Sequence, residues 1–362
     1  MFSKVNLFEI CSPKQWKTIS GNEILNEGKY PVYGANGIIG YFNEYNHESE
    51  TLLITCRGAT CGTLNISLPK SYINGNAMAL DNLSNNVEIK YLFYSLSVRG
   101  FRDIITGSAQ PQITKVGLEK IKIPLPPLSV QKSIAEKLDK ADALRKKDQE
   151  LLAQYDELAQ SIFIDMFGDP VKNEKGWEIS KIENIILTID NIGRQKFAEK
   201  IQYVDISSID NVRKKITKTA HFNLDKRPSR AQQILKKGDV LLSTVRPNLK
   251  NIAINDVDDY IGSTGFFVFR CKKEIINKNY LFEALNSDSV TEKFERMVSG
   301  ANYPALKSSD IKIFELAVPP LSLQNQFAEK IKNIEAQKAI LKQQAQESEN
   351  LFQALLQESF SF

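Results

Sequence analysis

One unit occurs twice in this chain, without gaps. The segment 107–167 aligns with the segment 300–360 at a constant offset of 193 residues. Each copy contains the motif Pro-Pro-Leu-Ser, which starts at Pro126 in the first copy and at Pro319 in the second. About forty residues of helix-like sequence follow each motif, whereas the sequences before the two copies are dissimilar. The chain is therefore predicted to alternate two different globular heads with two copies of one spacer.

Both spacers are predicted to be long helices. No Gly or Pro lies between Ser129 and Phe167, and Gly168-Asp169-Pro170 then supplies a C-terminal stop. Because the two prolines disfavour helix before them, Ser129 and Ser322 are predicted to be the N-caps. A helix over 129–167 has a length of about 58 Å, which exceeds that of an ordinary domain helix.

Each spacer has a single apolar stripe at near-heptad spacing, interrupted at equivalent positions by Arg145 and Lys338. The stripes consist of Ile134, Leu138, Ala141, Leu144, Leu151, Tyr155, Leu158 and Ile162 in the first spacer and of Phe327, Ile331, Ile334, Leu341, Ala345, Phe352 and Leu355 in the second. Antiparallel pairing within the chain buries both stripes and places one head at each end. A coiled coil that only joins two chains is the alternative.

The bulk composition favours a globular protein of two to three domains, since 362 residues with 42% hydrophobic content can bury two cores. No run approaches the ~20 apolar residues of a bilayer span, and the N-terminus lacks an apolar signal-peptide core, so a cytoplasmic location is predicted. The four cysteines lack a CxxC spacing. We expect reduced, packed thiols, with a bridge between Cys56 and Cys61 as the alternative.

Charge is unevenly distributed along the chain. Residues 1–128 contain 12 Lys and Arg against 10 Asp and Glu, and residues 170–310 contain 24 against 18. The segments 129–169 and 311–362 contain 6 against 9 and 5 against 6. The heads are basic and the spacers acidic, so a polyanion is expected to bind the heads.

The two heads are predicted to be mixed α/β and related in plan. Short β-like runs at 51–55 and 239–244 each lead into a polar loop that is punctuated by Gly or Pro. Trp16 and Trp177 each follow a polar turn and are predicted to open their heads. The interval from Trp to Pro-Pro is longer in the second head, so the heads are unequal in size.

Motifs of enzymatic chemistry are missing from the sequence. There is no GxGxxG or GxxxxGK[ST] phosphate loop, no HExxH or CxxC metal motif, and no Asn/Asp-Pro-Pro-Tyr/Phe motif of amino-methylation. The only histidines, His47 and His221, lie in polar turns and are predicted to be surface residues. The acidic run 256–259 is predicted to be a solvated loop, because its residues lack the spacing of a metal-binding site.

The loops of the heads carry side chains suited to reading DNA. Arginine pairs with guanine, asparagine and glutamine pair with adenine, and serine, threonine and lysine also serve phosphates. An exposed loop residue without a ligand is the alternative for each candidate. The candidate contacts are Arg57, Thr60, Asn74, Asn76, Gln110 and Gln112 in the first head and Arg194, Lys196, Arg246, Asn248, Lys250, Ser263, Thr264, Asn302 and Tyr303 in the second.

The tracts 123–139 and 318–331, together with 166–170 and Gly176-Trp177, resemble the conserved regions of the specificity (S) subunit of type I restriction-modification enzymes. The resemblance covers the whole chain in the order head, helix, head, helix, although the chain is short for the family. It implies target-recognition domains over 1–128 and 170–321 and spacer helices over 129–169 and 322–362. The expected fold is two mixed α/β domains separated by an antiparallel intramolecular coiled coil, with a pseudo-twofold internal repeat.

The resemblance also implies partners. A protein of this family is expected to bind a bipartite, asymmetric site in double-stranded DNA. It is also expected to bind two methyltransferase (M) subunits that carry S-adenosylmethionine and, through the complex, motor-nuclease (R) subunits. No cofactor is expected in this chain and no membrane contact. Because the spacers are alike where the heads differ, the M subunits are predicted to dock near the helix–head junctions. The residues predicted there are Gln131, Glu136, Lys137, Gln324, Glu329 and Lys330.

Two other functions remain open at this point. A single-chain DNA methyltransferase or nuclease with degenerate motifs predicts turnover by the purified chain without any added subunit. A coiled-coil scaffold that binds only protein predicts no DNA affinity even when M subunits are present.

Overall fold

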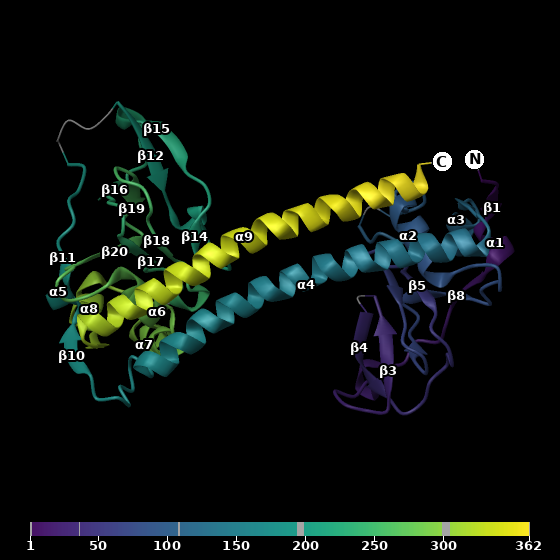
Figure 1. Cartoon of the computed structure of the whole chain (residues 1–362), viewed down its shortest axis with the longest axis horizontal. Helices are drawn as coiled ribbons and strands as arrows, with labels where there is room; N and C mark the ends of the chain where they lie inside the picture. Colours follow the sequence, from purple (N-terminus) through teal and green to yellow (C-terminus); the bar gives the residue numbers. More distant parts are fainter. Residues whose placement is uncertain (1, 36, 108, 194–198, 299–304, 362) are drawn as a thin grey trace. The chain divides into compact units, whose positions relative to one another are not determined.

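The computed structural model describes residues 2–35, 37–107, 109–193, 199–298 and 305–361 (Figure 1). It divides into two compact units. Unit 1 consists of Met1–Gln149 and Gln343–Phe362, and unit 2 consists of Glu150–Lys342. Each unit therefore contains one head and one part of each long helix.

The head of unit 1 is built on antiparallel strand pairs and one parallel pair. A four-stranded antiparallel sheet has the order β2-β8-β5-β6, and a three-stranded sheet has the order β4-β3-β7, in which β3 and β7 are parallel. The strands are β1 (Lys4–Asn6), β2 (Ser12–Gln15), β3 (Tyr30–Gly34), β4 (Gly37–Phe42), β5 (Leu52–Thr55), β6 (Leu64–Ile66), β7 (Tyr72–Ile73), β8 (Ala77–Asp81) and β9 (Lys122–Pro124), and the helices are α1 (Leu7–Ile10), α2 (Ile89–Arg99) and α3 (Lys115–Leu118).

Strand β5 explains how this core is layered. Its residues are buried without exception, and successive side chains point to opposite faces of a strand. Leu52 and Ile54 accordingly join the cluster that contains Leu92 of α2. Leu53 joins the cluster on the other face, with Tyr33 of β3. The continuous apolar run is thus a central strand covered on both sides.

Unit 2 repeats this plan with more elements. Its sheets have the orders β11-β20-β17-β18 and β15-β12-β19-β16, with β12 and β19 parallel, and a β13–β14 hairpin is added. The strands are β10 (Glu178–Lys181), β11 (Ile186–Leu187), β12 (Lys200–Val204), β13 (Ile209–Asp210), β14 (Lys215–Ile216), β15 (Ala220–Asn223), β16 (Ala231–Ile234), β17 (Val240–Ser243), β18 (Ile252–Ile254), β19 (Ile261–Ser263), β20 (Phe266–Cys271) and β21 (Glu315–Val318), and the helices are α5 (Ile182–Ile185), α6 (Lys278–Asn286), α7 (Asp288–Met297) and α8 (Ser308–Ile313).

The central strand of unit 2 has the same two-faced burial. Val240 and Leu242 of β17 join Tyr280 of α6 in one cluster, whereas Leu241 joins Val204 of β12 in another. Strand β17 therefore corresponds to β5, and α6 to α2. The mixed α/β content predicted for both heads is confirmed.

The prediction that Trp16 and Trp177 open their heads equivalently is wrong. Trp177 precedes β10 and donates its indole N–H to the carbonyl oxygen of Phe167 at 2.8 Å. Trp16 instead follows β2 and donates to Asp81 Oδ2 at 3.0 Å. The prediction placed both tryptophans after a polar turn, whereas Trp16 directly follows a strand, and β1 and α1 come earlier in the chain.

The two long helices are α4 (Leu128–Phe167) and α9 (Leu321–Phe360), each of 40 residues. Gly168 ends α4 in the left-handed conformation, with φ +74, and its N–H donates to the carbonyl oxygen of Ile164 at 2.8 Å. No helix among the described residues is both long enough and apolar enough to cross a bilayer.

The N-caps differ from the prediction. Each helix begins one residue before the serine that was expected to cap it, so Ser129 and Ser322 lie inside the first turn. The carbonyl oxygen of Pro127 accepts the N–H groups of Val130 and Gln131, at 2.9 and 3.1 Å. A proline carbonyl is available to begin the helix because the proline ring removes only the N–H.

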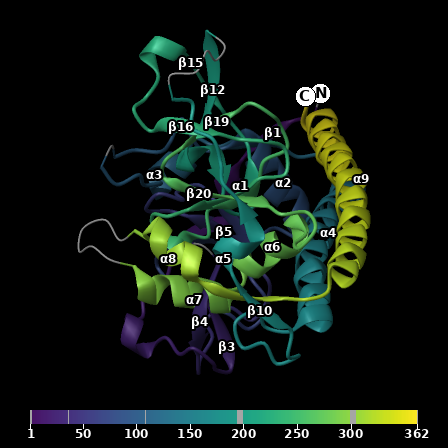
Figure 2. The same cartoon turned by 90° about the vertical axis from the view of Figure 1, so that its left-hand side faces the viewer.

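Contacts between α4 and α9 occur in both units, where the helices lie side by side in both views (Figure 1 and Figure 2). In unit 1, buried Asp148 of α4 accepts hydrogen bonds from Ser348 Oγ at 2.6 Å and Gln344 Nε2 at 3.0 Å of α9. In unit 2, the ring of Phe327 in α9 lies 5.6 Å from Phe163 and 5.4 Å from Phe167 in α4. Also in unit 1, Ile134 near the start of α4 and Phe360 at the end of α9 pack against one cluster that contains Leu138 and Phe352. Within each unit, the start of one helix therefore meets the end of the other.

The polar residues that interrupt the apolar stripes have partners. Arg145 donates to Glu349 of α9 at 3.2 Å, and its guanidinium lies 4.6 Å from the ring centre of Phe352. Lys338 donates to Glu335 one turn away at 2.6 Å. In unit 1 the interruption therefore joins the two helices instead of weakening them.

Candidate nucleic-acid interface

Three loops of unit 1 meet at one end of the four-stranded sheet. The N–H of Cys56 donates to Asn76 O at 3.1 Å, and the N–H of Ile113 donates to Cys56 O at 3.0 Å. Arg57 and Gln112 face each other in an isolated antiparallel bridge. Residues that are far apart in sequence are thereby held within one loop cluster by backbone hydrogen bonds.

Most side chains predicted to contact DNA in the first head are exposed in this cluster. They provide one cation, one hydroxyl and three amides, the groups that read base edges and phosphates. The exposed members are Arg57, Thr60, Asn76, Gln110 and Gln112.

Asn74 does not belong to this set. Its side chain is only 3% exposed, and its Oδ1 accepts the N–H of Gly75 at 2.8 Å. Its own N–H donates to Tyr33 O at 2.9 Å. Asn74 shapes the turn before β8, so the structure corrects its assignment as a DNA contact.

Unit 2 builds its loop cluster on the same backbone frame. The N–H of Thr244 donates to Gly265 O, and the N–H of Leu306 donates to Thr244 O, both at 2.9 Å. These bonds reproduce the pair made by Cys56 in unit 1, and Leu306 stands 193 residues after Ile113, the offset of the internal repeat. The repeated unit therefore begins inside the head, at the loop cluster itself.

The side chains on this frame differ between the units. Val245 and Ala305 form the isolated bridge in unit 2 that corresponds to the bridge between Arg57 and Gln112 in unit 1. Arg246 is exposed one residue beyond the position that corresponds to Arg57. The exposed candidates of unit 2 are Arg246, Asn248 and Thr264.

Two candidates of the second head are engaged inside the protein. Ser263 is 3% exposed, and its Oγ accepts the N–H of Gly265 at 3.1 Å. Lys250 donates its ammonium to Asp288 Oδ1 at 2.5 Å and to Asn286 O at 3.0 Å. The structure corrects Ser263 as a direct DNA contact, and it engages the ammonium of the partly exposed Lys250 within the protein.

Four further candidates lie outside the described residues. They are Arg194, Lys196, Asn302 and Tyr303.

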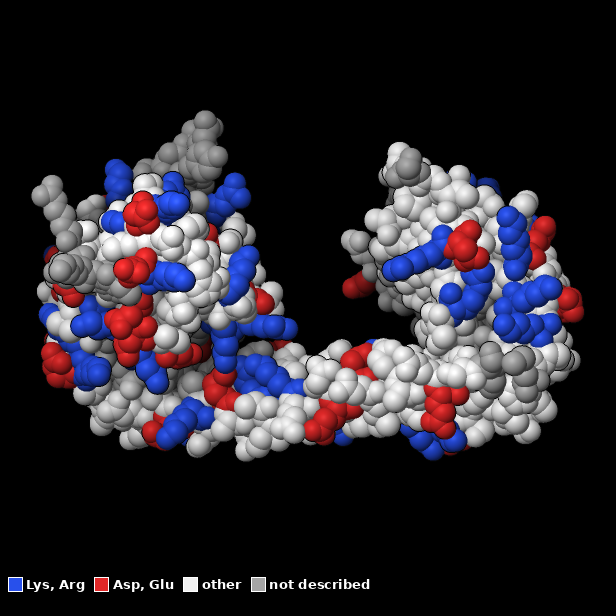
Figure 3. Space-filling view, turned by 90° about the horizontal axis from the view of Figure 1, so that it is seen from above, with Lys and Arg blue, Asp and Glu red and all other residues white. Residues whose placement is uncertain are grey.

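Charged side chains lie in groups on the visible faces of both heads, between areas of other residues (Figure 3). Figure 3 shows groups of Lys and Arg over the head of each unit, interleaved with Asp and Glu. Basic groups distributed in this way attract a polyanion without forming one continuous patch.

The helix–head joints are built by a repeated glutamine. Gln131 is fully buried, and its Nε2 donates to Pro126 O at 2.8 Å and to Asn86 O at 2.9 Å. Its Oε1 accepts the N–H of Glu88 at 2.9 Å, just before α2. Both amide hydrogens and the amide oxygen are thus used within unit 1.

Gln324 makes the equivalent bonds in unit 2. It is fully buried, and its Nε2 donates to Pro319 O at 2.7 Å and to Ile275 O at 3.1 Å. Its Oε1 accepts the N–H of Asn277 at 2.8 Å, which is the residue before α6. The prediction that Gln131 and Gln324 bind a partner is wrong, because neither side chain has surface or bonding capacity to offer.

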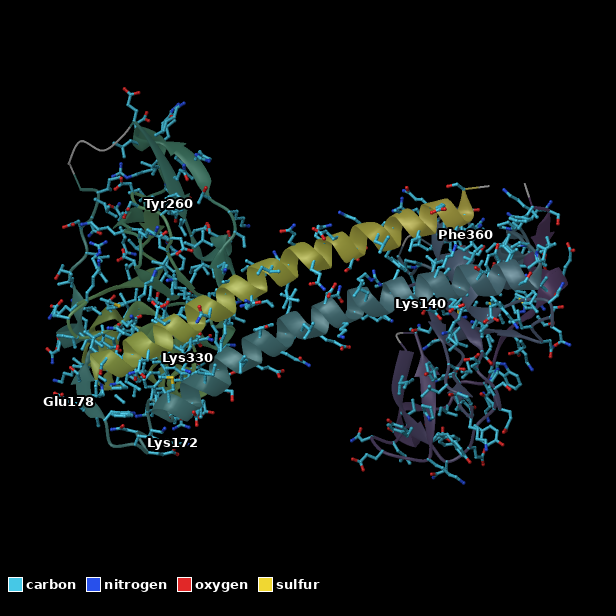
Figure 4. The ribbon with its side chains drawn as sticks, viewed as in Figure 1. Lys140, Lys172, Glu178, Tyr260, Lys330 and Phe360 are labelled. Atoms are coloured by element: carbon cyan, nitrogen blue, oxygen red, sulfur yellow. The ribbon has the colours of Figure 1, made fainter. Side chains whose placement is uncertain are left out.

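The other residues predicted to bind a partner are exposed on the long helices. Glu136 pairs with Lys140 at 2.7 Å, and Lys140 and Lys330 can be located on α4 and α9 in Figure 4. The exposed set consists of Glu136, Lys137, Glu329 and Lys330.

One histidine prediction also changes. His221 is exposed, as expected. His47 is only 9% exposed, with Nε2 2.9 Å from Asp81 Oδ1 and Nδ1 2.7 Å from Asn46 Oδ1. His47 therefore ties a loop to β8 in the interior of unit 1, and its reading as a surface residue is wrong.

The cysteines are free thiols. Burial raises the pKa of Cys11 and of Cys271 to about 12, which keeps both protonated and unreactive at neutral pH.

Sequence comparison finds one family across most of the chain. The profile described as "Type I restriction modification DNA specificity domain" matches residues 2–154 and 174–350. The two matched segments each include one head.

Individual relatives agree with this result. The chain is 26% identical over 346 residues to the type I restriction enzyme MjaVIII specificity subunit of Methanocaldococcus jannaschii, covering 85% of this chain and 80% of that protein. It is 24% identical over 332 residues to a putative type I specificity subunit of Mycoplasma pneumoniae, covering 88% and 85%. The crystal structure of a type I restriction-modification S subunit from M. genitalium has a similar fold, with a TM-score of 0.64 at 15% identity over 99% of this chain and 96% of that one.

Proposed function

Because this chain belongs to the family of type I restriction-modification specificity subunits, we propose that it reads a bipartite, asymmetric site in double-stranded DNA with one half-site per head. Specificity subunits are the non-catalytic recognition components of these systems. One observation carries the proposal to this chain: both heads hold a loop cluster on the same backbone frame, with different exposed side chains.

The differing side chains account for unequal half-sites. At the equivalent bridge positions, unit 1 presents Arg57 and Gln112, whereas unit 2 presents Val245 and Ala305. Arginine and glutamine make bidentate contacts with guanine and adenine, which valine and alanine cannot make. The two heads therefore select different bases from similar positions in the groove.

The long helices are proposed to set the gap between the half-sites. Helices of 40 residues are about 60 Å long, enough to separate two heads by the ~34 Å between neighbouring half-sites. The opposed contacts of α4 and α9 in each unit support an antiparallel intramolecular coiled coil with a pseudo-twofold relation. The proposed domain boundaries are 1–128 and 170–321 for the target-recognition domains and 129–169 and 322–362 for the helices.

An insertion tests whether the helices set the gap between the half-sites. One heptad added after Gln149 and one after Lys342 keeps the apolar stripes facing each other and lengthens the pair by about 10 Å. We expect the recognised gap to widen, by at most about three base pairs, while both half-site sequences stay unchanged. If the lengthened protein still selects the original gap, the helices do not measure it.

Two M subunits are proposed to dock near the helix–head junctions, one around Glu136 and Lys137 and the other around Glu329 and Lys330. These exposed residues occupy equivalent positions of the repeat, as two copies of one partner require. S-adenosylmethionine is expected on the M subunits, R subunits are expected to join through the complex, and the assembly is proposed to act in the cytoplasm. Reversing the charge of Glu136 and Lys137 should release one M copy, measured by native mass spectrometry, whereas the same change at the exposed pair Lys146 and Glu150 should not.

Binding and turnover assays separate this function from its alternatives. The purified chain with S-adenosylmethionine and DNA should transfer no methyl group, and addition of M subunits should give sequence-specific binding. Turnover by the chain alone supports a single-chain enzyme. Loss of all DNA affinity in the presence of M supports a protein-binding scaffold.

A further inference from the structure

The recognition loop of unit 2, residues 245–249, is held in an unusual backbone conformation. Arg246 before the 3-10 turn and Lys250 after it both have left-handed φ values, +50 and +46. Side chains other than glycine rarely adopt this region, and such residues persist only where their surroundings fix them. Something outside the turn must therefore hold this loop.

Lys250 supplies the first restraint. Its ammonium donates to Asn286 O at 3.0 Å, at the last residue of α6, and to Asp288 Oδ1 at 2.5 Å, at the first residue of α7. The Lys250 side chain is 25% exposed, whereas that of Asp288 is 80% exposed. The charge expected to meet a phosphate is thus directed at the junction of two helices.

Lys214 supplies the second restraint. Its Nζ reaches from the β13–β14 hairpin and donates to the carbonyl oxygen of Lys250 at 2.7 Å. Burial, and then the neighbouring Lys250 ammonium, lower the pKa of Lys214 to about 8. The lowered pKa shows that the charged form of Lys214 is disfavoured at this place beside a second cation. A positional role for its bond to the loop accounts for a lysine here.

The corresponding loop of unit 1 places glycine at its left-handed positions. Its left-handed positions are Gly58 and Gly62, with φ +91 and +94. Glycine adopts this region without steric cost. The anchors Lys250 and Lys214 therefore belong to the loop whose left-handed residues are not glycine.

From these contacts we propose that Lys250 and Lys214 are positioning residues for DNA recognition. They hold the 245–249 loop so that Arg246 and Asn248 face the half-site of unit 2, and they determine its specificity without touching DNA. This inference rests on the proposed function and concerns one of its two half-sites.

The test compares Lys250→Met, Lys214→Met and the wild type, each assembled with M subunits. Binding is measured on the selected site and on single-base variants of each half-site, at several salt concentrations. We expect discrimination within the half-site of unit 2 to fall ~10-fold in both variants, while the half-site of unit 1 and the salt dependence stay unchanged. Lys218→Met, an exposed lysine of the same unit, is the control and should match the wild type.

A phosphate contact by Lys250 gives a different result. In that case, Lys250→Met weakens binding to all sequences alike and reduces the salt slope by about 1, which overturns the inference. Asp288→Ala sharpens the distinction because it removes the side-chain acceptor of Lys250 and leaves the Lys250 charge and its bond to Asn286 O in place. The inference predicts lost discrimination for Asp288→Ala, whereas a phosphate-binding Lys250 predicts tighter binding to any DNA.

Failure of the proposed function is recognisable separately. A wild-type complex that binds all duplexes equally overturns the proposed function and this inference with it. A wild-type complex that is specific, together with variants that remain equally specific, overturns only the inference.

Discussion

Replacing Gln324 by methionine should destabilise unit 2 more than any exposed substitution on the same helix. Methionine has a similar size and flexibility, so the change removes the amide while nearly preserving the volume. The carbonyl oxygens of Pro319 and Ile275 and the N–H of Asn277 lose their partner; the bond to Pro319 is buried and the other two bonds are partly buried.

The magnitude follows from counting those groups. A buried polar group that is left without a partner costs about 1–3 kcal/mol. Because two of the three groups are only partly buried, each is taken at the lower limit, which gives a loss of about 3 kcal/mol in the free energy of unfolding of unit 2. A loss of this size is a large part of the ~5–15 kcal/mol that stabilises a typical domain.

Tryptophan fluorescence during urea unfolding measures the effect unit by unit. The chain has 2 tryptophans, Trp16 in unit 1 and Trp177 in unit 2, so a Trp16→Phe background reports only unit 2. The control is Gln326→Met, an exposed position on α9 that should change stability by no more than about 0.5 kcal/mol. If Gln324→Met costs no more than Gln326→Met, the buried amide does not hold the head on its helix, and our reading of the joint is refuted.

Three further perturbations test other parts of the structure. Gln131→Met should lower the stability of unit 1 by a similar ~3 kcal/mol and leave the Trp177 transition unchanged, because its bonds repeat those of Gln324. Ser348→Ala removes a hydrogen bond to the buried carboxylate of Asp148 and should cost unit 1 about 2 kcal/mol by Trp16 fluorescence; an unchanged transition contradicts the importance of this interhelix contact. The pKa of Lys214 is lowered to about 8 in the folded chain, so between this value and its ordinary 10.5 the unfolded chain binds more protons and rising pH stabilises unit 2. As the pH rises from about 7.5 to about 9, the urea midpoint of Lys214→Met should therefore decrease relative to that of the wild type. A difference between the two midpoints that stays constant with pH rules out this titration.

The long helices could be predicted from the sequence because the residues that favour and end a helix are neighbours in the chain. The absence of Gly and Pro and the stop at Gly168 place the helix end within a short stretch of chain. The start was misplaced by one residue, since the carbonyl of Pro127 begins the helix before the serine expected to cap it. A capping residue chosen by type does not reveal which carbonyl the backbone presents.

The loop cluster could be predicted from the sequence only in part. Exposed polar loop residues such as Arg57 are recognisable as candidates, but the hydrogen bond between Cys56 and Ile113 joins segments 57 residues apart and leaves no local signal. Asn74 and Ser263 were misassigned because short polar side chains in turns often bond to neighbouring backbone groups instead of a ligand.

Helical periodicity marks the buried glutamines in the sequence. Gln131 precedes Ala135 and Leu138 at helical spacings of four and seven, and all three are buried on one face of α4. A polar residue on the apolar face of a helix must have internal hydrogen bonds, so this position indicates a joint within the protein.

Selection of binding sites from random duplexes tests the central claim that each head reads its own half-site. Complexes of M subunits with the wild type, with Arg57→Ala and with Arg246→Ala are each used to select DNA, and the bound sequences are compared position by position. We predict a bipartite motif for the wild type, loss of preference at a base of one half with Arg57→Ala, and loss in the other half with Arg246→Ala, each by about 1–3 kcal/mol. Relaxation of the same half by both variants, or identical motifs from all three complexes, contradicts the assignment of one half-site to each head.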